Sequence, residues 1–205
     1  AACVSVHGAN RLGSNSLIDL VVFGRATGHK ISATLKPGAP HAPASKAADD
    51  FALGRLDHFR NARGPAPTAQ IRLAMQKCMQ ANCGVFRTDE ILSEGIQKLD
   101  GVYKSMSDIG VTDRGLIWNT DLIETLELEN LIGQAAVTVS GGLNRTESRG
   151  AHAREDFPDR NDHDWMKHTL VTVDAAGKVG FDYRPVHMHT LTNDVEVVPP
   201  KKRVY

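Results

Sequence analysis

The sequence predicts an α+β fold in three parts: the end of an α/β domain over residues 1–45, an antiparallel three-helix bundle over 46–145, and a small C-terminal α+β domain containing a β-hairpin over 146–205. Three observations support this prediction. A strand-like run leads through a Gly- and Asn-rich loop into a helix, three segments repeat apolar residues at helical spacing, and two alternating runs flank a turn sequence.

The first part reads as a strand, a tight loop and a helix. Residues 3–7 alternate apolar and polar side chains, and residues 8–15 supply the loop. Ser16 lies where a helix N-cap belongs, and apolar residues at helical spacing continue to about Ala26. The Pro- and Ala-rich run 36–45 then predicts a surface linker.

Three strongly periodic segments predict the bundle. Thr88 offers a cap to the second helix, one of residues 119–121 caps the third, and Gly141-Gly142 ends the third. Amphipathic helices joined by short loops form antiparallel bundles. The apolar stripes are Ile71, Ala74, Met75, Cys78 and Met79, then Leu92, Ile96, Leu99, Val102, Tyr103 and Met106, then Leu122, Leu126, Leu128, Leu131, Ile132, Ala135 and Val139.

Near the C-terminus, residues 169–173 and 178–183 alternate around the turn sequence 174–177, which predicts a hairpin. The charged run 147–158 precedes them. It fits a substrate or partner surface, a solvated loop, or an internal ion-pair network between domains. The mixture of both charge signs favours the network, with Arg149, His152 and Arg154 set against Glu155 and Asp156.

Composition excludes several classes of protein. The 205 residues carry 24 Lys+Arg against 24 Asp+Glu, so the charge expected of a nucleic-acid or anionic-membrane binder is absent. A hydrophobic content of 41% is too high for a disordered chain, and no apolar run is long enough to span a bilayer. The cysteines Cys3, Cys78 and Cys83 predict no disulfide framework, and Cys78 and Cys83 fit buried apolar thiols. Because the chain starts at Ala1 with a strand already under way, we expect it to begin inside a domain.

The loop before the first helix is the strongest candidate for chemistry. The first helical turn, at Asn15, Ser16 and Leu17, presents free backbone N–H groups and the positive end of the helix dipole. Such a site favours binding of a negatively charged group, such as a reduced flavin, a phosphate or a carboxylate. Arg11 could hold a carboxylate through two parallel hydrogen bonds. The alternative is that Asn15 and Ser16 only cap the helix and that Arg11 forms a surface ion pair.

Other catalytic patterns are weak. The pairs His187/His189 and His163/His168 could bind a metal, but no third ligand follows at a recognised spacing, so surface or core histidines are favoured. The sequence contains neither G-x-S-x-G nor G-x-G-x-x-G, and no general base stands out. We therefore predict no metal site and assign no catalytic residue within this chain.

The loop and helix over residues 5–25 resemble the last flavin-contacting segment of the succinate dehydrogenase and fumarate reductase flavoprotein family. The resemblance continues through the three helices, the charged run 147–157, the tripeptide at 184–186 and Pro199-Pro200, and so covers essentially the whole chain. Ile18-Asp19 is typical of the succinate dehydrogenases, whereas fumarate reductases tend to have Ala-Glu there. A fumarate reductase flavoprotein and a non-catalytic helical interaction module derived from the family are the alternatives.

The resemblance implies an FAD enzyme of respiratory complex II that oxidises succinate to fumarate. It assigns Arg11 to a substrate carboxylate, and Asn15, Ser16 and Leu17 to the flavin through the helix start. It also implies an iron–sulfur subunit and membrane anchor subunits as partners, no nucleic acid, and no membrane span of its own. The implied location is peripheral, on the cytoplasmic face of a bacterial inner membrane or the mitochondrial matrix face.

The family's other flavin and substrate residues are expected upstream of Ala1. The isolated 205 residues are therefore expected neither to hold FAD nor to oxidise succinate. The direction of the reaction, succinate oxidation or fumarate reduction, stays open.

Overall fold

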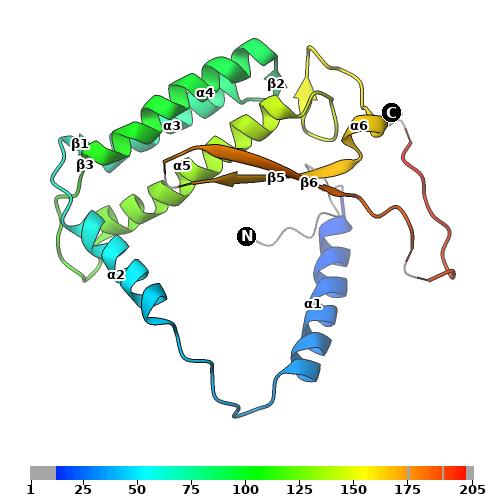
Figure 1. Cartoon of the computed structure of the whole chain (residues 1–205), viewed down its shortest axis with the longest axis horizontal. Helices are drawn as coiled ribbons and strands as arrows, with labels where there is room; N and C mark the ends of the chain where they lie inside the picture. The colour runs from blue at the N-terminus through cyan, green and yellow to red at the C-terminus, as the bar shows by residue number, and fades with distance from the viewer. Residues whose placement is uncertain (1–12, 175, 191, 202–205) are drawn as a thin grey trace.

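The computed structural model describes residues 13–174, 176–190 and 192–201, and Figure 1 shows a helical bundle with a long β-hairpin lying along it. The fold is mixed α+β and mostly helical, as predicted, whereas the three domain boundaries stay a prediction. The elements are α1 (Asn15–Thr34), α2 (Lys46–Arg60), β1 (Ala66–Pro67), α3 (Thr68–Asn82), β2 (Phe86–Arg87), α4 (Asp89–Lys104), η1 (Ser105–Asp108), β3 (Ile109–Gly110), α5 (Thr120–Asn144), β4 (Ala153–Arg154), α6 (Asp162–Trp165), β5 (Lys167–Val173) and β6 (Val179–Pro185).

Helices α3, α4 and α5 form the antiparallel bundle that their apolar stripes predict. β1 precedes α3 and β3 follows α4, and the two strands pair in parallel, so α3 starts where α4 ends. β2 pairs with β4 at the opposite end, where α5 finishes. The buried side chains between these helices include Leu92 and Leu128, both 0% exposed. Gly95 allows the close approach of α3 and α4, because a Cβ there would lie 2.7 Å from that of Asn82.

Helix α2 is an addition to the predicted bundle. The Ser45 side chain caps it by accepting a hydrogen bond from the Ala48 amide at 3.2 Å. Its Phe59 is buried in the core, and its Arg55 pairs with Glu129 and donates to the Leu126 carbonyl at 3.0 Å. The sequence prediction of three helices was therefore incomplete, because α2 packs on α5 through contacts distant in sequence.

The end of α5 also differs from the prediction. The helix runs through Gly141-Gly142 to Asn144. Gly142 is buried, and a Cβ there would approach Arg87 and Leu92 to 3.6 Å. This glycine serves close packing rather than helix termination.

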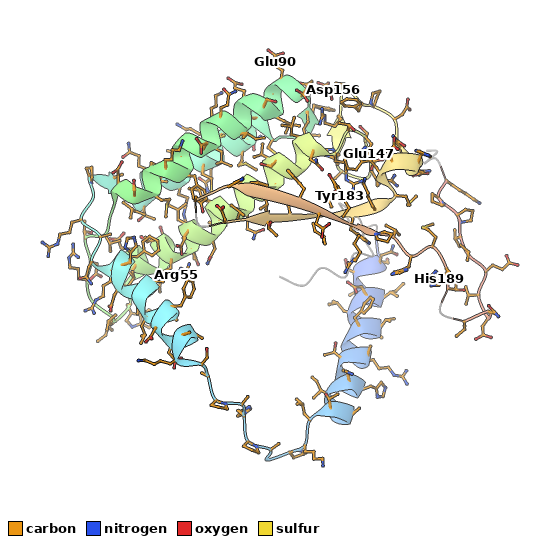
Figure 2. The ribbon with its side chains drawn as sticks, viewed as in Figure 1. Arg55, Glu90, Glu147, Asp156, Tyr183 and His189 are labelled. Atoms are coloured by element: carbon orange, nitrogen blue, oxygen red, sulfur yellow. The ribbon has the colours of Figure 1, made fainter. Side chains whose placement is uncertain are left out.

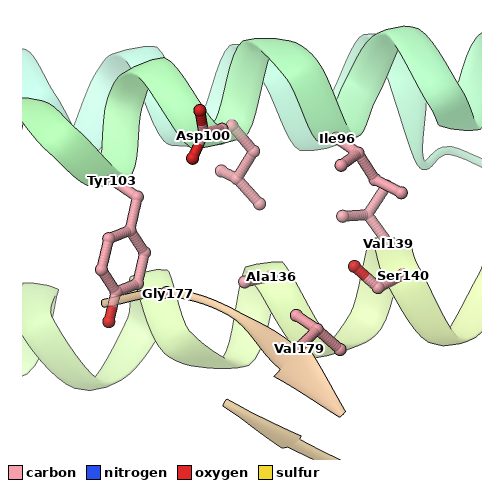
Figure 3. A pocket seen from close by; sticks show the side chains of 9 residues that line it. Ile96, Asp100, Tyr103, Ala136, Val139, Ser140, Gly177 and Val179 are labelled. Carbon is pink, nitrogen blue, oxygen red and sulfur yellow. The ribbon is translucent and has the colours of Figure 1, made fainter. Parts of the chain in front are cut away.

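The predicted hairpin is confirmed. β5 and β6 pair antiparallel from Lys167↔Pro185 to Val173↔Val179, and the hairpin packs on α5. Its turn rests on Tyr103 of α4, and the turn, α4 and α5 together line an open pocket of about 200 Å³ (Figure 3).

Helix α1 extends to Thr34, beyond the predicted end near Ala26, and the segment 36–45 that follows is irregular, as expected for a linker. Within the described residues, α1 contains no buried side chain. No helix in the described part of the chain is both long enough and apolar enough to cross a membrane.

Candidate functional site

The start of α1 carries three of the four predicted binding residues. The helix begins at Asn15, and Ser14 occupies the N-cap with φ 67°. The Leu17 amide donates to the Ser14 carbonyl at 3.2 Å. The prediction that Ser16 is the N-cap was therefore wrong, because the left-handed turn at Ser14 starts the helix two residues earlier.

The structure brings Asn15, Ser16 and Leu17 together in one open helical turn. Asn15 and Leu17 are exposed and Ser16 is half-buried. Arg11, the predicted carboxylate ligand, lies outside the described residues. Whether these residues bind flavin or substrate stays a prediction.

The electrostatics of this turn differ from those of α2, α4 and α5. Ser45, Thr88 and Asn119 cap those three helices through their side chains, and each of those helices has an acidic residue in its first turn. Helix α1 has neither a side-chain cap nor a first-turn acid, and α3 shares both absences. No side-chain cap therefore occupies the first-turn amides of α1, which is what an anion in front of the helix would require.

Exposed apolar side chains begin in this turn of α1 and continue along the helix. Leu17, Leu20 and Val21 are 68%, 68% and 70% exposed. An anionic edge on a flat apolar ring system would meet amide donors at the helix tip and apolar side chains along its side. The residues present therefore fit the isoalloxazine of FAD.

A second cluster lies where α5 meets α6 (Figure 2). Its centre is Glu147, which is 0% exposed. Arg149 donates to Glu147 from Nε at 2.7 Å, Arg145 donates at 2.5 Å, and the Asn161 amide donates at 2.9 Å. Burial alone would raise the pKa of Glu147, but these hydrogen bonds outweigh burial and hold the pKa below its usual value.

The buried Arg154 joins two helix ends. It makes a bidentate pair with Asp156, with both N···O distances at 2.7 Å, and it donates to the Gly142 and Leu143 carbonyls at the end of α5. Asp156 in turn accepts from the Asp89 amide at the start of α4, at 2.8 Å. A cation at one helix C-terminus and an anion at the next N-terminus both complement the dipoles. The hydrogen bond from Arg154 lowers the pKa of Asp156 to about 2.

His152 lies between three arginines. Its Nδ1 accepts from Arg87 Nη1 at 2.9 Å, because guanidinium only donates, so the proton sits on Nε2, which donates to the Arg145 carbonyl at 3.1 Å. Burial, followed by the charges of Arg87, Arg154 and Arg145, lowers the pKa of His152, although the Arg145 carbonyl opposes this. The imidazole is neutral in the folded protein near pH 7.

These contacts confirm the predicted internal ion-pair network and extend it. The sequence prediction missed Arg145, Arg87 and Asp162, which pairs with Arg149 at 2.8 Å. The sequence did contain a signal for Arg145, because this residue directly follows a long helix and cations are favoured at helix C-termini. Among the described residues, Glu155 of this predicted network is exposed and forms no ion pair.

The remaining candidates are structural. Cys78 and Cys83 are buried, as predicted, and burial raises the pKa of both thiols. His187 and His189 have ring centroids 5.5 Å apart and lie in the irregular segment that follows β6. Within the described residues, no three His, Cys, Asp or Glu side chains gather as metal ligands would.

Comparison with known families identifies this architecture. The family described as the fumarate reductase flavoprotein C-terminal region matches residues 72–205, which include the bundle, the ion-pair cluster and the hairpin. The chain belongs to this family. Its resemblance to the succinate dehydrogenase and fumarate reductase flavoproteins is thereby confirmed.

Individual relatives of this flavoprotein family extend the match to α1. The chain is 55% identical over its whole length to the succinate dehydrogenase flavoprotein subunit of Rickettsia bellii, covering 34% of that protein. It is 54% identical to the mitochondrial succinate dehydrogenase [ubiquinone] flavoprotein subunit of Oryza sativa, covering 32% of it. The chain thus spans about a third of the length of these relatives.

A solved structure supports the same assignment. The fold superimposes on FrdA of E. coli quinol fumarate reductase with a TM-score of 0.84 and 37% identity, covering the whole of this chain and 34% of that one. The sequence is therefore more similar to the two succinate dehydrogenase flavoproteins than to this fumarate reductase.

Proposed function

We propose that this chain acts as the C-terminal part of an FAD-dependent succinate dehydrogenase flavoprotein. The observation that carries this proposal is the identity of 55% and 54% to two succinate dehydrogenase flavoproteins over the whole chain. The fumarate reductase alternative is less favoured, since identity to FrdA is 37%.

The roles proposed for the residues follow from the chemistry of the helix start. Bound FAD would take up the two electrons released when succinate becomes fumarate. Arg11 would grip one succinate carboxylate and fix the orientation of the dicarboxylate. The first-turn amides of Asn15, Ser16 and Leu17 would stabilise negative charge on the ring edge facing them. The exposed apolar side chains of α1 would exclude water from that edge.

The end of an FAD-binding α/β domain is proposed for residues 1–45, in agreement with the uncovered face of α1. The proposed partners are the iron–sulfur subunit and the membrane anchor subunits of a complex II. The proposed location is the cytoplasmic face of a bacterial inner membrane or the mitochondrial matrix face.

The experiment that tests the function uses the full-length flavoprotein that contains this segment. Arg11→Ala should leave bound flavin unchanged and lower kcat/KM for succinate about 100-fold to 1000-fold, because a bidentate, charge-assisted carboxylate contact is lost. Arg25→Ala, on the exposed side of α1 where Arg25 donates to His29, is the matched control. If Arg11→Ala and Arg25→Ala keep equal activity, the substrate role of Arg11 is wrong.

A second variant tests the flavin contact. Asn15→Asp keeps the side-chain size and adds a negative charge at the helix start, which favours the helix but repels an anion in front of it. The added charge should lower the midpoint potential of the flavin or the affinity of the protein for it, while the helix content of the protein is preserved. Unchanged flavin properties would show that the start of α1 does not face the flavin.

A further inference from the structure

The open pocket between α4, α5 and the turn of the β5–β6 hairpin has a volume of about 200 Å³ (Figure 3). An apolar cavity of about 150 Å³ is already large enough to bind benzene. The pocket therefore has room for a molecule with one six-membered ring. Its walls are mainly aliphatic, and they are formed by Ile96, Leu99, Ala136, Val139 and Val179.

The α5 wall of the pocket carries one buried hydroxyl, that of Ser140. Ser140 is 9% exposed, and within the described part of the chain its Oγ takes part in no hydrogen bond. Thr125 and Thr138 of the same helix each donate to the carbonyl four residues earlier, at 2.8 and 2.6 Å. Figure 3 shows the Ser140 oxygen directed into the space between α4 and α5. Ser140 thus leaves the usual backbone acceptor of a helical hydroxyl and offers its hydroxyl to the pocket.

The hairpin turn that borders the pocket is held by its own hydrogen bonds. The Asp174 carboxylate accepts from the Ala176 and Lys178 amides, both at 2.9 Å, and the Gly177 amide donates to the Asp174 carbonyl at 3.0 Å. The turn also rests on the Tyr103 ring, since a Cβ at Gly177 would lie 3.0 Å from it. A site that is formed in advance loses little conformational entropy when a ligand binds.

The charges at the pocket favour a neutral ligand. Among the described residues that line it, Asp100 is the one with a charged side chain, and the Lys104 ammonium donates to its carboxylate at 2.6 Å. Lys178 lies between two lining residues in the sequence, but it is exposed and does not line the pocket. A charged ligand would therefore leave water without an unpaired partner of opposite sign, which is costly.

Water alone matches this lining poorly. A buried water molecule makes about three hydrogen bonds, whereas Ser140 supplies the one buried polar side chain among the described residues of the lining. The aliphatic walls and the Tyr103 ring offer a water molecule nothing. An aromatic ring is suited to both surfaces, because aromatic pairs are favourable beyond the area that they bury.

We propose that this pocket binds a small neutral molecule with one aromatic ring and one hydrogen-bonding group, of which phenol is the simplest example. The ring lies between the aliphatic walls and Tyr103, and the polar group bonds with the Ser140 hydroxyl. The site goes beyond the proposed function, because neither flavin nor succinate takes part in it. A bound molecule contacts the hairpin turn, α4 and α5 together, since all three line the pocket.

The test titrates the full-length flavoprotein that contains this segment with phenol and with benzene, and saturation-transfer NMR gives each Kd. Wild-type protein should bind phenol more tightly than benzene. Ser140→Ala should raise the Kd for phenol about 5-fold and leave that for benzene unchanged, because one hydrogen bond is lost. Thr138→Val is the matched control, since it removes an exposed hydroxyl of the same helix that is bonded to the Gln134 carbonyl.

Two further variants fill the pocket from opposite sides. Ala136→Leu adds bulk from α5 and Val179→Phe adds bulk from the hairpin, so each should abolish binding of both phenol and benzene. The charged analogues benzoate and benzylamine should bind the wild type at least about 10-fold more weakly than phenol does.

Several results would overturn the proposal. The wild type might show no saturable phenol binding, which would mean that only water fills the pocket. Equal phenol affinity in Ser140→Ala and the wild type, or phenol binding that survives both filling variants, would place phenol elsewhere. Tighter binding of benzoate or benzylamine would contradict a neutral ligand. Phenol binding in a protein that does not oxidise succinate would contradict the proposed function and leave this site intact.

Discussion

Helices α1 and α5 are the two longest in the described part of the chain, with 20 and 25 residues, and both carry apolar side chains along their length. Helix α5 buries nine residues and packs against α2, α3, α4 and the β5–β6 hairpin, whereas α1 buries none. Most helical stability in proteins comes from packing of an apolar face. The difference shows that α5 is packed within the core of the described residues, whereas the apolar side chains of α1 are not buried by any of them.

The largest expected effect comes from placing the same charge in each helix. Leu128→Asp puts a carboxylate at a position that is 0% exposed, and it should cost more than about 4 kcal/mol and unfold the bundle. Leu20→Asp changes a residue that is 68% exposed and should alter the stability of the 205-residue chain by less than about 0.5 kcal/mol. Thermal unfolding followed by circular dichroism measures both.

The same two substitutions, made in the full-length flavoprotein, test whether α1 is covered there. There Leu20→Asp should become destabilising and lower flavin content, because the proposed function places the flavin against this face of α1. A strong effect of Leu20→Asp in the 205-residue chain would contradict the contrast between α1 and α5.

Local patterns predicted the bundle well, because the buried faces of α3, α4 and α5 follow helical periodicity. Helix α2 escaped prediction because its main anchors are Phe59 and Arg55. Arg55 binds Glu129 and the Leu126 carbonyl, more than seventy positions along the chain. No local pattern reports such contacts.

The second largest effect is expected at the ion-pair cluster. Arg154→Ala leaves Asp156 and two helix-end carbonyls without their buried partner, so it should cost about 3–5 kcal/mol. The control is Arg160→Ala, where a partly exposed pair with Asp162 at 2.8 Å should cost less than about 1 kcal/mol. Denaturant unfolding measures the loss of unfolding free energy in both variants. Equal losses would mean that the contacts of Arg154 with Asp156 and the end of α5 do not join α4 to α5.

The candidate site was only partly predictable. The charged run predicted contacts of Arg154, His152 and Asp156, because positive and negative side chains within one segment favour ion pairing. It could not show that Glu147 is the buried centre, since that depends on how far α6 folds back over the end of α5. At the start of α1, residue type predicted the open turn, but the left-handed φ at Ser14 moved the N-cap.

A pH effect of intermediate size follows from His152. Its pKa is lowered in the folded state below the ordinary value of 6.5, so the unfolded chain binds more protons as the pH falls past 6.5 and stability declines there. His152→Gln keeps one acceptor for Arg87 and one donor for the Arg145 carbonyl without titrating. The variant should therefore lose less thermal stability than the wild type between pH 7.5 and 5.5.

The matched control is His163→Gln, because the His163 side chain is 93% exposed. Its thermal stability between pH 7.5 and 5.5 gives the baseline with which the effect of His152→Gln is compared. Asp156 adds a second decline at lower pH: its pKa of about 2 against 3.8 means that stability present above 3.8 is lost as the pH falls towards 2. If His152→Gln and the wild type decline in parallel between pH 7.5 and 5.5, the neutral tautomer assigned to His152 is wrong.

The smallest effects are expected at two glycines, one in the hairpin and one in α1. Substitution in the hairpin should change the melting temperature, whereas substitution in α1 should change only the helix content. At Gly177, φ is 82°, and a Cβ would lie 3.0 Å from the Tyr103 ring, so Gly177→Ala should cost about 1–2 kcal/mol and lower the melting temperature by a few degrees. At Gly28, in α1, a Cβ meets nothing within 4 Å, and alanine favours a helix by up to about 1 kcal/mol. Because α1 is not packed on the core, Gly28→Ala should raise helix content at 222 nm without moving the cooperative melt. A shift of the melt by Gly28→Ala would show that α1 unfolds together with the bundle.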